Sequence, residues 1–442
     1  MPAAEQAQQH PATAGCPPAA PAGPSAGPAR AHDGPAAGQP PSCPAAPRVA
    51  LLTGGFDKPY TFGLATALAA AGILVEIVGG DAIDCPDYHR YAGIRFLNLR
   101  SQRGGRARRL ADLIVYYARL AAYATRRSPP IFHVIWNGRW ETLDRTVLML
   151  YYRALGKRVL LTAHNVNAAV RDGGNSLWNR LTLRIQYRLA NHIFVHTEAM
   201  KRELSRDFSV RAGKVTVIPF GLNNSLPETG MPPAEARRRL GLGPADRVIL
   251  FFGNIRPYKG LEYLAAAFPP LAERDPRYRL VIAGPCQAGN EAYWDSVRAL
   301  VPPRIADRVL LRIEQVPDAE AEAYFRAADV MALPYTHVYQ SGVLFTGFAF
   351  GLPAVAADVG ALREEIRDGE NGFTCPPRDA AALAGAIQRF FSSDLYRNLD
   401  TRRPEIAAQA EREHSWTAVA AATAGVYAAI AGARRDAAWW PR

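Results

Sequence analysis

The feature that most constrains the fold is an alternation of short apolar segments with helical segments, which runs from residue 48 onward. In the first half "RVALLT" precedes "FGLATALAAAG" and "ILVEIVGG"; in the second half "DRVILFFGNI" precedes "GLEYLAAAF" and "YRLVIAG". Nearly continuous apolar strands separated by helices are typical of parallel sheets covered on both faces. The sequence therefore predicts an α/β fold with parallel sheets.

The alternation occurs twice, and a Pro/Gly-rich segment, "GLNNSLPETGMPPAEARRRLGLGPADR", separates the two halves. A chain of 442 residues is also too long for one typical core. We therefore expect one domain over 48–222 and a second over 223–415. Ligands of open α/β sheets bind outside the carboxyl ends of the strands, which predicts a cleft between the two domains.

The two ends of the chain have different compositions. Residues 1–47 are mostly Pro, Ala and Gly, so we expect a disordered tail, and it lacks the basic and apolar regions of a signal peptide. Residues 416–433 are uncharged over about the length that spans a membrane. Alanine is only weakly apolar, however, and the preceding "REHSW" is typical of the start of a soluble helix. We therefore expect a helix of a soluble protein rather than a membrane span over 416–433.

The formal net charge of +12 is concentrated in one domain. Residues 48–222 carry 26 Lys and Arg against 12 Asp and Glu, whereas the segments before and after each have a net charge of −1. The excess predicts a polyanionic partner such as phosphates or an anionic membrane, although a solvated basic loop and helix start would explain "LRSQRGGRARRLADL" equally well. No recognition helix or pattern of stacking aromatics accompanies the charge, so we expect no nucleic-acid partner.

The five cysteines are scattered and form no CxxC pair. Disulfide frameworks and zinc sites use paired or regularly spaced cysteines, so neither is expected here. This cysteine usage predicts a cytoplasmic location.

Two segments of the second domain have the composition of a phosphate site. In "ILFFGNIRPYKGLEYLAAAF" a strand ends at Gly253, a turn carries Arg256 and Lys259, and a helix follows. In "YTHVYQSGVLFTGFAFGLPAVAADVG" Ser341 and Gly342 stand where a loop becomes a helix. Helix N-termini with nearby cations bind phosphate, although a strand–turn–helix with surface bases would give the first pattern too.

Together "RPYKG", "FGLPAVAADVGALREEI…NGF" and "VIPFG" resemble the retaining glycosyltransferases of family 4, also called glycosyl transferases group 1, which have the GT-B fold. The resemblance covers residues 48 to about 436. It implies two facing Rossmann-like domains, with the acceptor on the first and a nucleotide-sugar donor on the second. It also implies a C-terminal helix, within 416–442, that crosses back onto the first domain.

The resemblance carries roles onto individual residues. Arg256 and Lys259 would hold the donor diphosphate, and His164 of "LLTAHN" would lie near the reacting sugar; without the resemblance, a strand-end histidine with a satisfied hydrogen bond is the simpler interpretation. The expected donor residues are Gly54, Gly55, Asn254, Arg256, Lys259, Gln340, Ser341, Gly342, Val343 and Thr346. The expected acceptor-side residues are His164, Asn165, His196, Arg106 and Arg109, with Thr197 a weaker candidate. His164, Arg256 and Lys259 are the expected catalytic residues.

The chain departs from the family pattern at three positions. Asn254 follows Gly253 where the family often has an arginine, and Arg256 is the candidate replacement. Val338 and Thr346 stand where family members commonly carry two glutamates, one near the donor sugar and one at the nucleotide ribose. Thr346 can still hydrogen-bond a hydroxyl, but as a neutral partner it is weaker than a carboxylate.

The resemblance also implies a chemistry, which is the transfer of a sugar from a nucleotide-sugar to a saccharide or lipid-linked acceptor with retention of configuration. Arg256 and Lys259 would stabilise charge on the departing diphosphate. No DxD motif or glycosidase-like pair of carboxylates is evident, so we expect neither a metal cofactor nor hydrolysis. The basic first domain favours an acceptor at the anionic inner face of the cell membrane, and so an enzyme of polysaccharide or glycolipid biosynthesis. A nucleotide-sugar 2-epimerase of the same fold and a catalytically silent scaffold remain alternatives.

Overall fold

The computed structural model describes residues 47–100, 106–126, 128–223 and 226–432. The predictions for residues 1–46 and 433–442 lie outside the described residues. Arg106 and Arg109 belong to the first turns of a described helix, but their side chains also lie outside what is described.

The N-terminal lobe is built on a seven-stranded sheet in the order β3-β2-β1-β4-β5-β6-β7. All of its neighbouring strands are parallel. The strands are β1 (Arg48–Leu52), β2 (Leu74–Gly80), β3 (Ile94–Arg100), β4 (Ile131–Val134), β5 (Arg158–Thr162), β6 (His192–Val195) and β7 (Val215–Val217). The inner strands β1, β4, β5 and β6 are apolar and almost wholly buried, as strands covered by helices on both faces are, whereas the edge strands β3 and β7 are mostly half-buried.

The C-terminal lobe contains a six-stranded parallel sheet in the order β10-β9-β8-β11-β12-β13. Its strands are β8 (Arg247–Phe252), β9 (Tyr278–Ala283), β10 (Val309–Arg312), β11 (Val330–Leu333), β12 (Ala354–Ala357) and β13 (Gly372–Cys375). In each lobe the first strand pairs with both the second and the fourth, which is the order of doubly wound folds. The predicted α/β fold with two parallel sheets is confirmed.

The helices of the N-terminal lobe are α1 (Lys58–Ala70), α2 (Arg106–Thr125), α3 (Glu141–Leu143), α4 (Met149–Ala154), α5 (Ala168–Arg171), α6 (Leu177–Leu189) and α7 (Glu198–Phe208). A π-helical segment, η3 (Asp144–Leu148), leads directly into α4. Short 3₁₀ turns are η1 (Asp81–Ile83), η2 (Pro86–Arg90) and η4 (Ala212–Lys214).

The second lobe begins with α8 (Pro233–Arg239), η5 (Pro257–Lys259), α9 (Leu261–Arg274), α10 (Glu291–Arg298), η6 (Pro303–Arg308) and α11 (Asp318–Ala327). It continues with α12 (Gly342–Ala349), α13 (Leu362–Glu365), α14 (Ala380–Ser392), α15 (Asp394–Arg397) and α16 (Leu399–Glu413), and the last helix is α17 (Trp416–Gly432).

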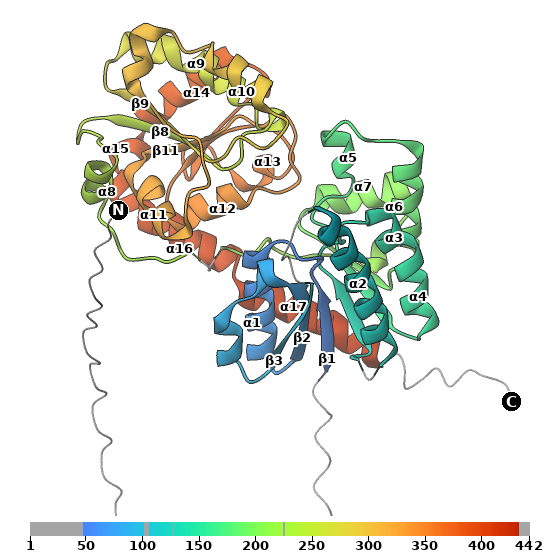
Figure 1. Ribbon diagram of the computed structural model, residues 1–442. Helices are drawn as coiled ribbons and strands as arrows, with labels where there is room; N and C mark the ends of the chain where they lie inside the picture. The colour runs from blue at the N-terminus through green and yellow to red at the C-terminus, as the bar shows by residue number, and fades with distance from the viewer. Residues whose placement is uncertain (1–46, 101–105, 127, 224–225, 433–442) are drawn as a thin grey trace, which may run out of the picture. The chain divides into compact units, whose positions relative to one another are not determined.

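Two helical layers cover the sheet of the N-terminal lobe. Side chains of α2, η3–α4, α6 and α7 form one core cluster with the strands, and those of α1 and α17 form another (Figure 1). A single large cluster fills the C-terminal lobe. Helix α17 therefore packs with the first sheet, although it follows the whole of the second in the sequence.

Trp416 sits where α17 meets the rest of the lobe. A Cβ added at Gly63 of α1 would lie 2.0 Å from the indole, and one added at Gly221 would lie 2.4 Å from it. The indole Nε1 donates to the carbonyl of Leu222 at 2.6 Å. The two glycines thus make room for Trp416, which anchors the start of α17.

The stretch Leu399–Gly432, which comprises α16 and α17, is the one among the described residues that is long and apolar enough to cross a membrane by length and composition. Core helices of soluble proteins pass the same test. Five residues of α17, Trp416, Val419, Ala420, Thr423 and Tyr427, are buried within the lobe. The Tyr427 hydroxyl bonds Nδ1 of His133 at 2.6 Å, and Nε2 of the same histidine bonds the Thr162 hydroxyl at 2.8 Å.

Candidate active site

The candidate site follows from strand order. In each sheet the chain leaves the first and fourth strands in opposite directions, which opens a crevice at their carboxyl ends. In the N-terminal lobe β1 leads to Asp57 and β4 to Trp136 and Asn137. In the C-terminal lobe β8 leads to Arg256, and β11 to Ser341.

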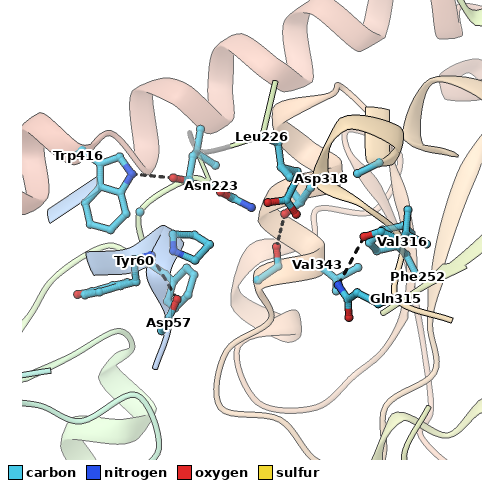
Figure 2. Close-up of a pocket in the computed structure, with 17 residues that line it drawn as sticks. Asp57, Tyr60, Asn223, Leu226, Phe252, Gln315, Val316, Asp318, Val343 and Trp416 are labelled. Carbon is cyan, nitrogen blue, oxygen red and sulfur yellow. Dashed lines mark hydrogen bonds between the residues drawn. The ribbon is translucent and has the colours of Figure 1, made fainter. Parts of the chain in front are cut away.

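Two cavities lie at these carboxyl ends. Cavity A has a volume of about 380 Å³ and is shown in Figure 2. Asp57, Tyr60 and Trp416 line one side of it. The other lining residues include Phe252, Gln315, Val316, Asp318, Gly342, Val343 and Thr346. Cavity A thus contains three of the predicted donor residues, all on α12.

Cavity B has a volume of about 760 Å³ and contains four of the predicted residues, His164, Asn165, Asn254 and Arg256. Its lining also includes Trp136, Asn137, Arg139, Arg145 and Gln186. Asp57 borders both cavities, so they meet at that residue. The structure therefore brings the predicted acceptor-side histidine and the predicted diphosphate arginine to one cavity.

Lys259 is the most unusual charge near the site. Its residue is 7% exposed, and its side chain makes no hydrogen bond or ion pair with the described residues. Its Nζ lies 5.9 Å from the ring centroid of Phe251 and 5.5 Å from that of Tyr335. Burial, and secondarily the charge of Arg256, lower the pKa of the ammonium. A buried cation without a counter-charge is costly, so this position favours an incoming anion.

Gly253 provides the room for that ammonium. Its φ is 97°, and an added Cβ would lie 2.9 Å from Nζ of Lys259 and 3.3 Å from Cγ2 of Val343. Lys259 therefore lies beside the start of α12, across the turn that follows β8. The "RPYKG" turn and the "QSGVL" segment, which are far apart in the sequence, meet here.

The N-terminus of α12 supplies free backbone donors. The Ser341 hydroxyl caps the helix by accepting from the N–H of Leu344 at 3.3 Å. The N–H groups of Gly342 and Val343 have no intrahelical partner because they belong to the first turn. A Cβ added at Gly342 would meet nothing within 4 Å, so space lies over this turn. Helix N-termini of this kind bind anions.

Two polar side chains in or next to α12, those of Thr346 and Gln340, differ in whether they have a hydrogen-bond partner. The Thr346 hydroxyl donates to the carbonyl of Gly342 at 2.8 Å, so its proton is used within the helix and only its lone pairs face cavity A. Both amide atoms of Gln340 are buried without a partner. Val338 belongs to the core of the C-terminal lobe and lines neither cavity.

His164 is held in one orientation by its neighbours. Its ring stacks on Trp136 with centroids 4.5 Å apart, and its Nδ1 lies 3.1 Å from Nε2 of His196. Its Nε2 is buried without a partner, and the residue lines cavity B. Burial, followed by the neighbouring histidines, lowers the pKa of His164 well below its usual value. The ring is therefore neutral at pH 7 and offers one nitrogen to a ligand.

Other predicted residues lie outside the two cavities. Gly54 has a φ of 60°, and its turn approaches the carbonyl of Asn137 so closely that a Cβ would lie 2.4 Å from it. It and Gly55 shape the turn after β1 and line neither cavity. His196 contacts the site through His164. Thr197 caps α7 by accepting from the N–H of Met200. The roles of these residues stay predictions.

Several residues of the site were not foreseen. Asp57 caps α1, accepting from the N–H of Tyr60 and from Nε1 of Trp136, both at 3.2 Å, and burial raises the pKa of its carboxyl. The aspartate directly before Lys58-Pro59 is a recognisable helix start. Arg139 and Arg145 follow β4, whose carboxyl end was a predictable ligand position once the strand was assigned.

The described residues contain no cluster of three or more His, Cys, Asp or Glu side chains that could hold a metal ion. The acids of cavity A are Asp57 and Asp318, which Figure 2 shows on different sides of it. The expected independence of a metal stays a prediction.

Comparison with known proteins assigns a family to each lobe. The family "Glycosyltransferase Family 4" matches residues 59–226, and "Glycosyl transferases group 1" matches residues 246–393. The chain resembles these glycosyltransferases in both lobes. The resemblance inferred from its motifs is thereby confirmed.

Curated relatives include two D-inositol 3-phosphate glycosyltransferases. That of Corynebacterium aurimucosum is 28% identical over 61% of this chain and 64% of its own length. That of Acidothermus cellulolyticus is 32% identical over 56% of this chain and 55% of its own length. The match thus spans between about half and two thirds of these relatives.

Solved structures show the same fold. Sucrose-phosphate synthase from Thermosynechococcus elongatus has a TM-score of 0.70 at 23% identity and covers 88% of this chain and 100% of its own. Anabaena Alr3699/HepE in complex with UDP-glucose has a TM-score of 0.66 at 17% identity and covers 86% of this chain and 99% of its own. The predicted GT-B fold is confirmed.

Proposed function

We propose that this protein is a retaining glycosyltransferase that moves a sugar from a nucleoside diphosphate donor to a saccharide or lipid-linked acceptor. The observation that carries the proposal is the buried, unpaired ammonium of Lys259 beside the N-terminus of α12. Arg256, which lines cavity B, and the free N–H groups of Gly342 and Val343, which line cavity A, add positive potential. A diphosphate supplies the negative charge that this arrangement lacks.

The donor would occupy cavity A and the region of Lys259. Its diphosphate would contact Lys259, Arg256 and the first turn of α12, and its ribose would lie towards Thr346. When the glycosidic bond breaks, charge builds on the departing diphosphate, and cations already fixed in place stabilise it without reorganisation. The complex of Alr3699/HepE with UDP-glucose supports a uridine nucleotide as the first donor to test.

The acceptor would occupy cavity B, beside His164. The guanidinium of Arg139 is exposed there and has no partner among the described residues, and Arg145 lies in the same lining. Arg145 is ion-paired with Glu141 of the same lining, so Arg139 is the cation that an acceptor would meet. An unpaired guanidinium favours an acceptor with a phosphate or carboxylate, in keeping with the name of the inositol phosphate relatives. Neutral His164 can bond an acceptor or donor hydroxyl through Nε2, while the leaving phosphate takes the acceptor's proton. We place the reaction in polysaccharide or glycolipid biosynthesis.

The test is a screen of UDP-, GDP- and ADP-sugars with candidate acceptors, read by release of the nucleotide and by mass of the product. One donor should support acceptor-dependent release, and Lys259→Ala should abolish it. Transfer should persist in EDTA, because the cations of the site are side chains and helix N–H groups. Formation of an epimer from UDP-sugar alone would instead assign a 2-epimerase. Absence of nucleotide release would favour the silent scaffold. Release that is equal in Lys259→Ala and wild type would contradict the role proposed for Lys259.

A further inference from the structure

We propose that the outer face of the helical layer formed by α2, η3–α4 and α6 docks onto an anionic lipid bilayer. The outer face is defined by eight exposed apolar side chains, Leu110, Ile114, Val115, Val147, Leu150, Leu177, Trp178 and Leu181. The inference does not depend on the proposed glycosyl transfer, because it concerns the side of these helices that faces away from the sheet.

Exposed apolar side chains are concentrated in the N-terminal lobe. Of sixteen large apolar side chains that are exposed among the described residues, fourteen lie between Phe56 and Leu181 and two, Leu300 and Leu311, lie in the C-terminal lobe. Leu177 is 85% exposed and Trp178 is 60% exposed. Single exposed apolar residues are ordinary on soluble proteins, whereas a gathering of them marks a binding surface.

The three helical elements of the layer are adjacent. The Tyr117 hydroxyl of α2 donates to Asp144 of η3 at 3.1 Å, and Tyr151 of α4 donates to the carbonyl of Ala121 of α2 at 3.4 Å. Helix α6 packs against both η3 and α4. Figure 1 shows α2, α4 and α6 grouped on the same side of the lobe. The three elements therefore form one layer, and the eight side chains are on its exposed side.

Each of these helices has apolar side chains on two sides, one buried and one exposed. Leu113, Leu148 and Leu183 point inward and belong to the core cluster on the sheet. The exposed side chains listed above lie on the other sides of the same helices. A core helix needs only one apolar stripe, so the second requires another partner.

The positive charge of this helical layer favours an anionic partner. Helices α2, η3–α4 and α6 carry five exposed arginines among the described side chains, Arg119, Arg153, Arg180, Arg184 and Arg188. Their acids are Asp112 and Asp144. Asp144 bonds Tyr117, and neither acid is exposed. On α6, Leu177 and Leu181 share a helical stripe with exposed Arg184 and Arg188. Leucine and tryptophan inserted among arginines are characteristic of helices that lie in the interface of an anionic bilayer.

A second copy of the chain fits this face less well, since two such faces would bring like charges together. The inner side of α6 contributes Leu183, Gln186 and Tyr187 to cavity B. A bilayer on the outer face would thus be separated from that cavity by a single helix.

The test is flotation of the full chain with vesicles of phosphatidylcholine alone or mixed with phosphatidylglycerol. The wild type should float with the mixed vesicles and not with phosphatidylcholine. The variant Leu177→Gln/Trp178→Gln/Leu181→Gln should bind about tenfold or more weakly, because three insertable side chains are removed. The matched control Leu300→Gln/Leu311→Gln removes exposed leucines from the other lobe and should bind like wild type.

A charge variant, Arg184→Gln/Arg188→Gln, should also bind more weakly, and added salt should weaken the wild type. Circular dichroism and thermal unfolding should be unchanged in all variants, since every replaced side chain is exposed. Equal flotation with both vesicle types, or undiminished binding of the triple variant, would overturn the proposal. A wild-type dimer that the triple variant converts to a monomer would reassign the face to self-association and overturn it too.

Discussion

At the scale of single residues, Lys259 makes the sharpest prediction. Because its ammonium is buried without a counter-charge, it costs folding free energy that a bound anion would recover. Lys259→Met should therefore raise the free energy of unfolding by on the order of 1 kcal/mol. It should also abolish stabilisation by UDP in thermal shift assays. Lys201→Met on α7, outside both cavities, is the control and should change neither quantity; a destabilised Lys259→Met protein would show that the ammonium has a partner.

The buried histidines predict a pH dependence of stability. Burial lowers the pKa of His133 to about 3 and that of His196 to about 4, from ordinary values near 6.5. Below pH 6.5 the unfolded chain binds protons that the folded chain does not, so stability falls with falling pH until the folded pKa is reached. Replacing His133 by Asn should reduce the slope of unfolding free energy against pH by about 1.4 kcal/mol per unit between pH 6 and 4.

Urea unfolding at several pH values measures this slope. Exposed His89→Asn serves as the control and should leave the slope as in wild type. The slope is informative even if the loss of the bonds to Tyr427 and Thr162 lowers stability at every pH. An unchanged slope in His133→Asn would mean that the buried ring is already protonated in the folded protein.

The residue scale also shows what the sequence could and could not reveal. Arg256 and Gly342 were candidates from their places after a strand and at a helix start, which are local properties. His164 was a candidate only through the family resemblance. The proximity of Lys259 to Val343 depends on packing between residues 84 positions apart in the sequence. The hydrogen bond that Thr346 donates to the carbonyl of Gly342 depends on a side-chain rotamer. Asp57 was recognisable as a helix cap, but its position between two cavities was not.

At the scale of elements, α17 depends on the space that glycines leave for Trp416. A Cβ at Gly63 would lie 2.0 Å from the indole, so Gly63→Ala must displace Trp416 or α1. Overpacking of this kind costs about 1–3 kcal/mol. Gly425→Ala, on the exposed side of α17 where an added Cβ meets nothing within 4 Å, is the matched control. It should stabilise the protein by about 0.5–1 kcal/mol, because alanine favours the helix.

Chemical unfolding of the two alanine variants measures both effects. Equal stabilisation of the protein by both substitutions would show that α17 does not rest on α1. The combination Gly63→Ala/Trp416→Leu should recover part of the loss, since the smaller side chain vacates the space that the new methyl group needs.

Periodicity revealed most strands and helices because their inward faces are apolar, as in "RVALLT" and "RIQYRL". It could not distinguish the second apolar stripe of α6 from its first. In "LWNRLTLRIQYRL" apolar residues occur on all sides, and only the fold decides that Leu183 is buried while Leu177 is exposed. The packing of Ala-rich 416–432 on the first lobe was expected from the resemblance, and its own composition indicated only a helix.

At the scale of the whole molecule, the Tyr339 hydroxyl is one of the links between the two lobes, alongside the Arg171 guanidinium over the Tyr258 ring at 4.5 Å. The Tyr339 hydroxyl, in the loop before α12, donates to Glu203 of α7 at 2.8 Å and accepts from the N–H of Asn167 at 3.3 Å. Asn167 in turn accepts at its side chain from Asn179 of α6 at 2.9 Å. The bond therefore joins the segment before α12 to helices of the N-terminal lobe.

Tyr339→Phe should raise hydrogen exchange in both lobes, around Asn167 and around residues 336–341, because one hydroxyl restrains both segments. The cost should be about 1–3 kcal/mol, since the half-buried Glu203 carboxylate loses its donor. Tyr293→Phe is a matched control, as its hydroxyl also bonds a glutamate, Glu262, but within the C-terminal lobe. It should raise exchange in that lobe only. If hydrogen exchange rose in one lobe only in Tyr339→Phe, the hydroxyl of Tyr339 would not restrain both lobes. Residues 336–341 would then not be connected to α6 through this hydroxyl.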